Sequence, residues 1–385
     1  MKSESIFKTL HLAALAGLAM AGTASAENLN YATGWASGAP LAIAAENWAA
    51  KVAKASGGDL TVTVFPLSLL NHAETSAGLR DGIADVGNLT VAYDPGRYPM
   101  MELMSDLTFT LAPQQRGNDS LAYVGAISEY ILLNCESCRA EFEAQNQIFL
   151  GSVASAPHDI LCAEAPIVAR DDFAGRTIRV GTETYSRFVG NFGGAPTRIS
   201  INEIVGAFSQ GVVDCAVLGA GEILSNRMEE VIKSVTLGVP GGSYSGITSA
   251  NFNTTAWRRL SAEHRAILAN SAADLSAEMS WRYLNARTIG IEDARARGIT
   301  VVDADPALAA EVATYRADQL AYYVEFYAKK YNITNVEAIA DELGTLMAKW
   351  VPLVKGVTDA ETLAEIYRAE IYNKIDAATY GLAVN

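Results

Sequence analysis

Positive charge is scarce in this sequence. Its 385 residues include 29 lysines and arginines against 43 aspartates and glutamates, which gives a formal net charge of −14. Nucleic acids and anionic membrane surfaces bind proteins through basic patches, so neither is an expected partner. The acidity does not exclude an anionic ligand, because one buried arginine in a cleft can override the overall field locally.

Histidine is equally scarce, and the usual catalytic and cofactor motifs are missing. There are four histidines, and the first, His11, lies in the N-terminal leader described below. The sequence has no paired zinc ligands and no glycine-rich phosphate loop. Residues 241–246 (GGSYSG) lack the strand-to-helix frame of a serine nucleophile. We therefore expect no metal, no cofactor and no catalysis.

There are only four cysteines, and their spacing leaves several interpretations open. Cys135 and Cys138 form a Cys-x-x-Cys pair, which suits a redox motif, half of a zinc site or a short disulfide. No second pair follows to complete a zinc site, and redox motifs of this kind are typical of cytosolic proteins. We favour a structural disulfide there, and a second one between Cys162 and Cys215, which fall in two predicted strands.

Long apolar runs are confined to the N-terminus. Residues 10–21 are apolar, Lys2 and Lys8 precede or flank them, and Ala24-Ser25-Ala26 is a small-residue cleavage site. The run is shorter than the ~20 residues that span a bilayer, which favours a signal peptide cleaved after Ala26 over an uncleaved anchor. An exported mature chain of 359 residues (385 minus 26) follows, long enough for two or three domains.

The mature sequence alternates between strand and helix patterns, which indicates an α/β fold. Strands are predicted at residues 29–33, 60–65 and 84–89. Helices are predicted at residues 40–56, between Pro40 and Gly57-Gly58, and at 74–82.

The segment 171–219 carries the strongest signal for a ligand site. A strand at 177–180 contains Arg179, a helix follows, and Gly193-Gly194 breaks the pattern. A second helix with Glu203 then leads to an apolar strand at 215–218. Strand, helix and strand in this order predict a parallel crossover, and ligands of such sheets bind beyond the carboxyl ends of the strands. Arg179 lies near such an end.

The same local pattern occurs twice. Gly82-Ile-Ala-Asp85 leads into the strand at 84–89, and Gly211-Val-Val-Asp214 leads into the strand at 215–218. A helix precedes both. This repetition predicts two similarly built lobes.

Several short motifs, in this order and spacing, resemble one family of proteins. They are Val64-Phe65-Pro66 with Glu74, the strand Asp85 to Asn88, Leu107-Thr108-Phe109, the Arg179 block, and Asn253 through Trp257 to Ser261. Together they are similar to the solute-binding proteins of tripartite ATP-independent periplasmic (TRAP) transporters, in the dicarboxylate-binding-protein-like class. The resemblance covers roughly residues 28–330.

The resemblance implies a two-lobed periplasmic binding protein of the type II-like kind, with a long connecting helix. Residues 27–151 with 241–280 would form lobe I, and residues 152–240 with 281–330 lobe II. Residues 261–297 have few helix breakers, and Ser261 is a plausible cap, which supports the long helix independently. The implied function is capture of a small organic acid in the periplasm and its delivery to the TRAP membrane subunits. A binding protein that feeds a sensor, and an exported thiol-disulfide oxidoreductase, are the alternatives.

The resemblance also assigns the binding residues. An arginine at the position of Arg179 grips the carboxylate of the solute, through a planar fork that lysine lacks. Trp35 is either a cleft residue or a core tryptophan, and Glu74 is either near the cleft or a helix-surface residue. Glu222 either reads an amine or cation, or caps a helix. Asn88 and Gly219 are expected beside the cleft.

Two departures from the family pattern bear on the ligand. His158 stands where many members have a second arginine, and it either fills an exposed loop or contacts the ligand and titrates near neutral pH. The asparagine that often precedes the next crossover strand is missing from residues 241–246. We therefore expect a monocarboxylate with an apolar or aromatic body, met by Trp35 and Tyr244, instead of a C4-dicarboxylate or sialic acid.

The residues after 330 form a C-terminal helical extension (331–385). Amphipathic helices are predicted at 336–350 and 359–380, with Trp350, Ile366, Tyr367, Ile371 and Tyr372 on apolar faces. We expect this extension to pack on the second lobe, or alternatively to form a homodimer contact. A monomer is the favoured state.

Overall fold

The computed structural model describes residues 26–111 and 118–382. The predicted signal peptide therefore lies outside the described residues, apart from Ala26. Within the described ranges, no helix is both long and apolar enough to cross a membrane.

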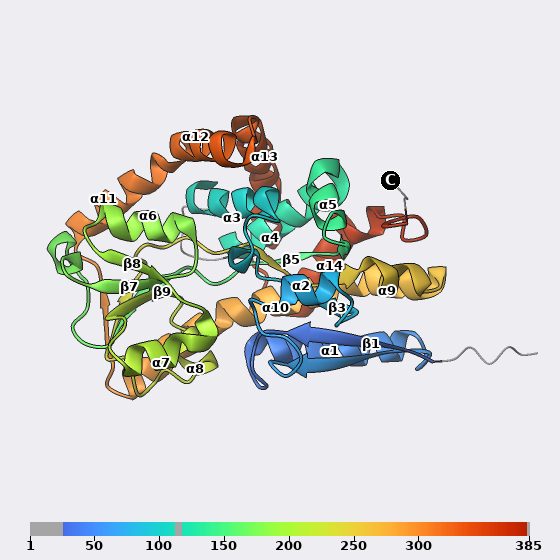
Figure 1. Ribbon diagram of the computed structural model, residues 1–385, viewed down its shortest axis with the longest axis horizontal. Coiled ribbons are helices and arrows are strands. Elements are labelled where there is room, and N and C mark those ends of the chain that lie inside the picture. Colours follow the sequence, from blue (N-terminus) through green and yellow to red (C-terminus); the bar gives the residue numbers. More distant parts are fainter. Residues whose placement is uncertain (1–25, 112–117, 383–385) are drawn as a thin grey trace, which may run out of the picture.

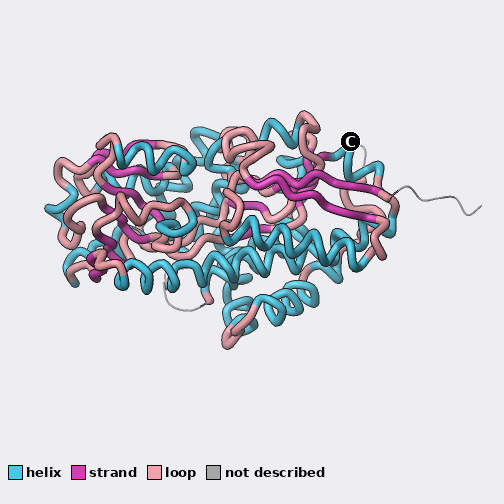
Figure 2. The backbone as a smooth tube through the Cα atoms, turned by 90° about the horizontal axis from the view of Figure 1, so that it is seen from below, coloured by secondary structure: helices cyan, strands magenta, loops and turns pink. Residues whose placement is uncertain are grey.

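The strands form two groups, one in each half of the molecule (Figure 2). In spatial order, the first sheet contains β2 (Leu60–Pro66), β1 (Glu27–Thr33), β3 (Val86–Gly87), β12 (Asn251–Asn253) and β4 (Gln147–Phe149). The second contains β13 (Thr300–Asp303), β10 (Ser234–Leu237), β6 (Asp159–Cys162), β9 (Cys215–Leu218), β7 (Thr177–Val180) and β8 (Ala195–Arg198). The expectation of a two-lobed α/β fold is confirmed.

Helices surround both sheets, and the last of them follow the sheets in the sequence (Figure 1). They are α1 (Pro40–Ala55), α2 (Thr75–Arg80), α3 (Pro99–Leu111), α4 (Asp119–Glu129), α5 (Glu136–Glu143), α6 (Glu183–Asn191), α7 (Ile204–Ser209), α8 (Glu222–Ser225), α9 (Thr254–Arg259), α10 (Ala262–Ala296), α11 (Pro306–Ala317), α12 (Gln319–Tyr331), α13 (Val336–Val354) and α14 (Ala360–Glu370).

The predicted crossover in the second lobe is present. β7 and β9 have the bounds expected from the sequence and pair in parallel, with Ile178 opposite Cys215. The helix expected around Glu203 begins only at Ile204, after a 3-10 turn over Ile201–Glu203. β8, which no pattern predicted, adds a parallel edge strand beside β7.

A short strand pair and one long helix are among the segments that join the lobes. The short antiparallel pair β5 (Ser152–Val153) and β11 (Ile247–Thr248) lies where the chain leaves the first sheet and where it returns. The helix α10 has 35 residues, or about 52 Å at 1.5 Å per residue, and contacts α1 and α14 at one end and α8 and β13 at the other. Its cap is the expected one, because the Ser261 hydroxyl accepts a hydrogen bond from the His264 amide.

Both expected disulfides are present. Cys162 and Cys215 face each other on the antiparallel strands β6 and β9. Cys135 is bonded to Cys138, and its sulfur also accepts the Cys138 amide at the start of α5. Cys135 and Cys138 are both buried, which favours a structural role over a redox one.

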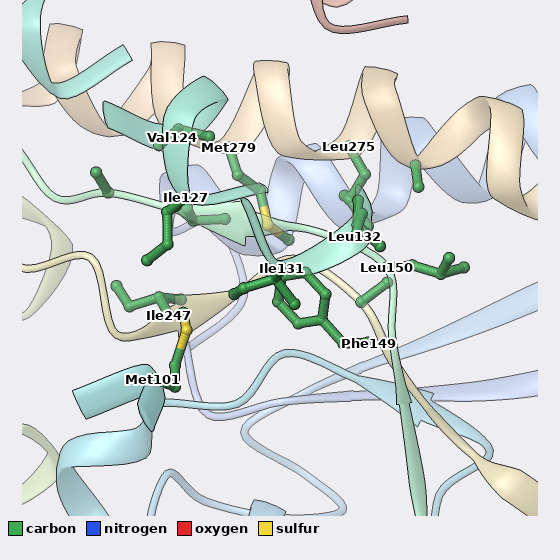
Figure 3. Packing of buried hydrophobic residues seen from close by; sticks show 14 of the residues in the cluster. Met101, Val124, Ile127, Ile131, Leu132, Phe149, Leu150, Ile247, Leu275 and Met279 are labelled. Carbon is green, nitrogen blue, oxygen red and sulfur yellow. The ribbon is translucent and has the colours of Figure 1, made fainter. Parts of the chain in front are cut away.

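The C-terminal extension packs on the first lobe, so the expectation that it packs on the second is wrong. α13 contacts α4 and α3, and α14 lies along α10. Trp350, Tyr367 and Tyr372 belong to the same buried cluster as Leu275 and Met279 of α10. Figure 3 shows Leu275 and Met279 pointing from α10 into this cluster. The apolar faces that suggested a dimer contact are thus used inside the chain.

Two predicted element bounds also differ. The last helix begins at its Asp359 cap but ends at Glu370, because Ile371 leaves helical geometry and Tyr372 turns inward to donate to the Leu150 carbonyl. The strand expected at 84–89 is reduced to β3, since the chain leaves the sheet after Gly87.

Candidate ligand-binding site

A cavity lies between the two lobes, and residues that follow or precede strands of both sheets supply its walls. Trp35 follows the end of β1, and Arg179 lies near the end of β7. Glu222 follows β9, and His158 immediately precedes β6. Because β6 runs antiparallel to β9, its beginning meets the carboxyl ends of β7 and β9 at one edge of the sheet. The topology therefore gathers these side chains.

Arg179 is the cation of the cavity. It is 3 % exposed, and its Nε atom donates to the Ile199 carbonyl at 2.9 Å. Among the described residues it forms no salt bridge. Burial lowers the pKa of Arg179, and the nearby Tyr93 and Glu222 oppose this effect. An arginine nonetheless stays charged in proteins, and the Nη atoms can grip a carboxylate in two places.

Glu222 supplies the opposite charge. The side chain is buried, and its two oxygens accept hydrogen bonds from the Tyr283 hydroxyl and the Asn226 amide. Burial raises the pKa of Glu222, whereas these two hydrogen bonds and the charge of Arg179 lower it.

The rest of the wall is largely aromatic. Trp35 meets the His72 ring edge-on at 4.2 Å between centroids, and His72 stacks on Tyr93 at 5.6 Å. Tyr244 also lines the cavity, but its hydroxyl accepts from the Ala92 amide and donates to the Gly246 carbonyl. Only its aromatic ring is therefore available to contact a solute. Other lining residues are Thr90, Ser155, Thr182, Tyr185, Ile201, Val217, Leu218 and Ile247.

Hydrogen bonds close the lobes around the cavity. The Asn202 amide donates to the Gly34 carbonyl at 3.2 Å, and the Ile201 amide donates to the Tyr93 hydroxyl at 3.0 Å. Arg198 donates to the Ala92 carbonyl at 3.0 Å. The segment that makes these contacts also accepts the hydrogen bond of Arg179 through Ile199. The backbone of residues 199–202 thus links the hydrogen bond of Arg179 to the contacts between the lobes.

A comparison with protein families decides the classification. Residues 31–330 match bacterial extracellular solute-binding protein, family 7. The chain belongs to this family. A curated relative, a solute-binding protein of Albidiferax ferrireducens, is 23% identical over 230 residues, which are 60% of this chain and 65% of the relative. The alignment thus spans slightly less than two thirds of that relative's length.

Solved structures of other solute-binding proteins share the fold. A TRAP solute-binding protein from Rhodoferax ferrireducens, in complex with copurified benzoate, has a TM-score of 0.74 at 20% identity and covers 85% of this chain and 99% of its own. One from an unidentified marine microbe, specific for aromatic acids and bound to 3-hydroxybenzoate, has a TM-score of 0.73 at 21% identity, covering 84% and 98%. One from Bordetella bronchiseptica with bound mandelate has a TM-score of 0.70 at 23% identity, covering 84% and 99%.

The structure places five of the eight sequence-predicted site residues of this solute-binding protein on the cavity wall: Trp35, His158, Arg179, Glu222 and Tyr244. The other three lie elsewhere. Glu74 is exposed and its side chain accepts from the Asn71 backbone amide, while the Asn71 side chain accepts from the Glu74 backbone amide, so the pair closes the turn before α2. Asn88 is buried, and neither polar atom of its amide has a hydrogen-bond partner among the described residues. Gly219 is buried beside Pro157 and Ala156.

Four aromatic lining residues were not predicted: His72, Tyr93, Tyr185 and Tyr283. His72 lies in a loop, Tyr93 in a 3-10 turn, and Tyr283 in the middle of α10. Only Tyr185 has a local signal, because it follows the Thr182 cap of α6 directly after the Arg179 strand. In the described ranges, no group of three or more His, Cys, Asp or Glu side chains is placed to hold a metal ion.

His158 differs from both expectations for it. It is buried, not in an exposed loop, and its Nδ1 atom lies 2.9 Å from the Tyr185 hydroxyl and 3.3 Å from the Gly242 carbonyl. Burial, assisted by the charges of Arg179 and Arg287, lowers the pKa of His158 to about 4, although the Gly242 contact opposes this. Burial likewise lowers the pKa of His72 to about 3. Both rings are neutral at pH 7, so titration near neutral pH is not expected.

A pH dependence of stability follows. An unfolded histidine binds a proton at about pH 6.5, but folded His158 binds it only near pH 4, so its stabilising contribution is present above pH 6.5 and lost as the pH falls towards 4. Between pH 8 and pH 5 the loss is about 2 kcal/mol for this histidine. Urea unfolding of the wild type and of His158→Gln at both pH values should show a smaller decrease in the variant. Equal decreases would contradict the neutral state of His158.

Proposed function

We propose that this solute-binding protein captures a small organic acid in the periplasm and delivers it to the membrane subunits of a TRAP transporter, without chemical change. The observation that carries the proposal is the buried guanidinium of Arg179, which forms no salt bridge among the described residues and lines a cavity between two lobes. A solute carboxylate offers two acceptor oxygens to the planar guanidinium, and charge-assisted, bidentate pairs of this kind are among the strong hydrogen bonds. Family membership supports the same role.

The aromatic wall favours an aromatic monocarboxylate as the solute. Trp35, Tyr93, Tyr185, Tyr244 and Tyr283 all line the cavity, and aromatic rings pack well against one another. One cation, Arg179, is present on this wall, which matches one carboxylate better than two. The structural relatives that bind benzoate, 3-hydroxybenzoate and mandelate support this class.

We further propose the lobe bounds that the sequence suggested for the two sheets, whereas α12, which begins within 281–330, packs on α3 of lobe I. All strands of the first sheet fall within residues 27–151 and 241–280, and all strands of the second within 152–240 and 281–330. Arg179, His158 and Glu222 then belong to lobe II, and Trp35 and Tyr244 to lobe I, so the solute bridges the lobes. The extension from residue 331 is proposed as a support of lobe I, with a monomer as the working state.

A thermal-shift screen of the mature protein tests the proposal. Organic acids, amino acids, sugars and amines are compared at equal concentrations. A carboxylate at a hundred times its dissociation constant adds about 2.7 kcal/mol of stability, which corresponds to a rise of several degrees in Tm. We expect the largest shifts from aromatic monocarboxylates. Shifts confined to neutral sugars or amines would overturn the assignment.

A further inference from the structure

The charges on the cavity wall nearly cancel before any solute arrives. Arg179 contributes one positive charge, and Glu222 is the acidic residue among the lining groups. His72 and His158 are held neutral by burial. Asp159, next to His158, is paired with Arg287 through two hydrogen bonds of 2.9 and 2.7 Å. A plain carboxylate bound to Arg179 would therefore leave the buried site with an excess negative charge.

Glu222 has acceptor capacity that the protein does not use. An ionised carboxylate accepts at about four lone-pair positions and donates at none. Tyr283 and Asn226 each supply one hydrogen bond, and both are neutral donors. Among the described residues Glu222 has no salt-bridge partner. The remaining lone pairs of this buried carboxylate thus accept no further hydrogen bond or salt bridge from the described residues, although the charge of Arg179 is near enough to act on it.

We propose that Glu222 is a specificity residue that accepts a hydrogen bond from a donor group on the solute, while Arg179 holds the carboxylate. This deepens the proposed function and rests on it. The donor is a hydroxyl or an ammonium group, close enough to the carboxylate for both to reach neighbouring strand ends of one sheet, since β7 and β9 are paired. An ammonium group would also restore the charge balance of the cavity.

His158 is consistent with this arrangement. A carbonyl oxygen can only accept, so the contact of Nδ1 with Gly242 favours the tautomer in which Nδ1 carries the proton. The Tyr185 hydroxyl, 2.9 Å from Nδ1, fits this tautomer as an acceptor, because it can donate its own proton to the Gly241 and Gly242 carbonyls at 3.4 Å. The other ring nitrogen, Nε2, is then an acceptor. Two acceptors, Glu222 and His158, consequently line the same cavity as the Arg179 donors.

Matched solutes test the proposal by isothermal titration calorimetry. Phenylacetate, mandelate and 2-phenylglycine differ at one carbon by hydrogen, hydroxyl or ammonium, and propionate, lactate and alanine repeat the series on a small skeleton. The wild type should bind a donor-bearing member at least about tenfold more tightly than the plain acid of its series, because hydrogen bonds to charged groups are the strong ones. Whether hydroxyl or ammonium gives the gain identifies the donor.

Variants locate the effect. Glu222→Gln removes the charge at nearly constant shape, and should reduce the preference for the donor-bearing solute to about threefold or less while improving binding of the plain acid. Glu203→Gln is the matched control, because it removes an exposed acid that is not part of the cavity wall. It should retain the wild-type preference. Asn226 donates to Glu222 but is not part of the cavity wall. Asn226→Ala should therefore increase the preference for the donor-bearing solute, and it replaces Glu222→Gln as the test if that variant does not fold.

The outcomes distinguish the role of Glu222 from carboxylate capture by Arg179. Tight binding of plain and donor-bearing acids alike, or an unchanged preference in Glu222→Gln, overturns the role of Glu222 and leaves carboxylate capture standing. Binding by no carboxylate of either series counts against carboxylate capture itself, and the role of Glu222 fails with it.

Discussion

Arg179→Ala is expected to fold normally and to lose most of its affinity for carboxylates. The side chain supplies the positive charge of the cavity wall, and it is 3 % exposed. Removing one partner of a buried, hydrogen-bonded charge pair costs about 2–5 kcal/mol of binding, or roughly thirtyfold to several thousandfold in Kd. Calorimetry with the best carboxylate from the screen measures the loss directly.

Two further variants make the result specific. Arg179→Lys keeps the charge but not the planar fork, so it should recover only part of the affinity. Arg176→Ala is the control, because this half-exposed arginine lies on the same segment outside the cavity. It should bind as the wild type does. The Tm of each variant without solute is compared first, since Arg179 also donates to the Ile199 carbonyl. Unchanged binding by a folded Arg179→Ala would show that the site is not centred on this residue.

Arg179 could be predicted from the sequence because it lies in a strand that the sequence pattern identifies. The apolar residues of β7 and β9 are buried throughout, and runs of this kind are readable without a structure. Once the two strands are known to be parallel, the place of Arg179 at a carboxyl end follows from topology. The same reasoning placed Trp35 after β1 and Glu222 after β9.

β8 shows where such reasoning stops. Its residues Ala195–Arg198 are mostly exposed and include a proline, as an edge strand permits, so neither alternation nor an apolar run marks it. Yet this strand leads into the segment that holds Ile199 against Arg179 and Asn202 against Gly34. The part of the site that depends on closure of the lobes was therefore invisible in the sequence.

The aromatic residues of the wall illustrate a second limit. Tyr283 comes from the middle of α10, about a hundred residues after Arg179, and it reaches Glu222 only because α10 contacts α8. His72 and Tyr93 stack on each other from two separate connections. Nothing in the local pattern distinguishes these residues from ordinary core or loop aromatics. Their role depends on tertiary packing.

Among the proposed variants, Trp350→Ala is expected to lower the free energy of unfolding most, because Trp350 packs the C-terminal extension against lobe I. Its ring is fully buried, and its Nε1 atom donates to Glu129 at 2.7 Å. Gly125 of α4 admits the ring so closely that a Cβ there would lie 2.4 Å from it. Truncating a buried tryptophan costs about 3–5 kcal/mol, which urea unfolding followed by circular dichroism can measure.

Graded variants show which part of the contact matters. Trp350→Phe keeps most of the packing but loses the hydrogen bond to Glu129, so its cost should be smaller, about 1–3 kcal/mol. Gly125→Ala should destabilise the same contact from the other side, since backbone and ring would have to separate. Val351→Ala alters the neighbouring side chain, which is 41% exposed, and should stay within about 0.5 kcal/mol of the wild type. Since none of these residues lines the cavity, carboxylate affinity of the folded variants should be unchanged. A Trp350→Ala protein as stable as Val351→Ala would mean that the extension contributes nothing to the core of lobe I.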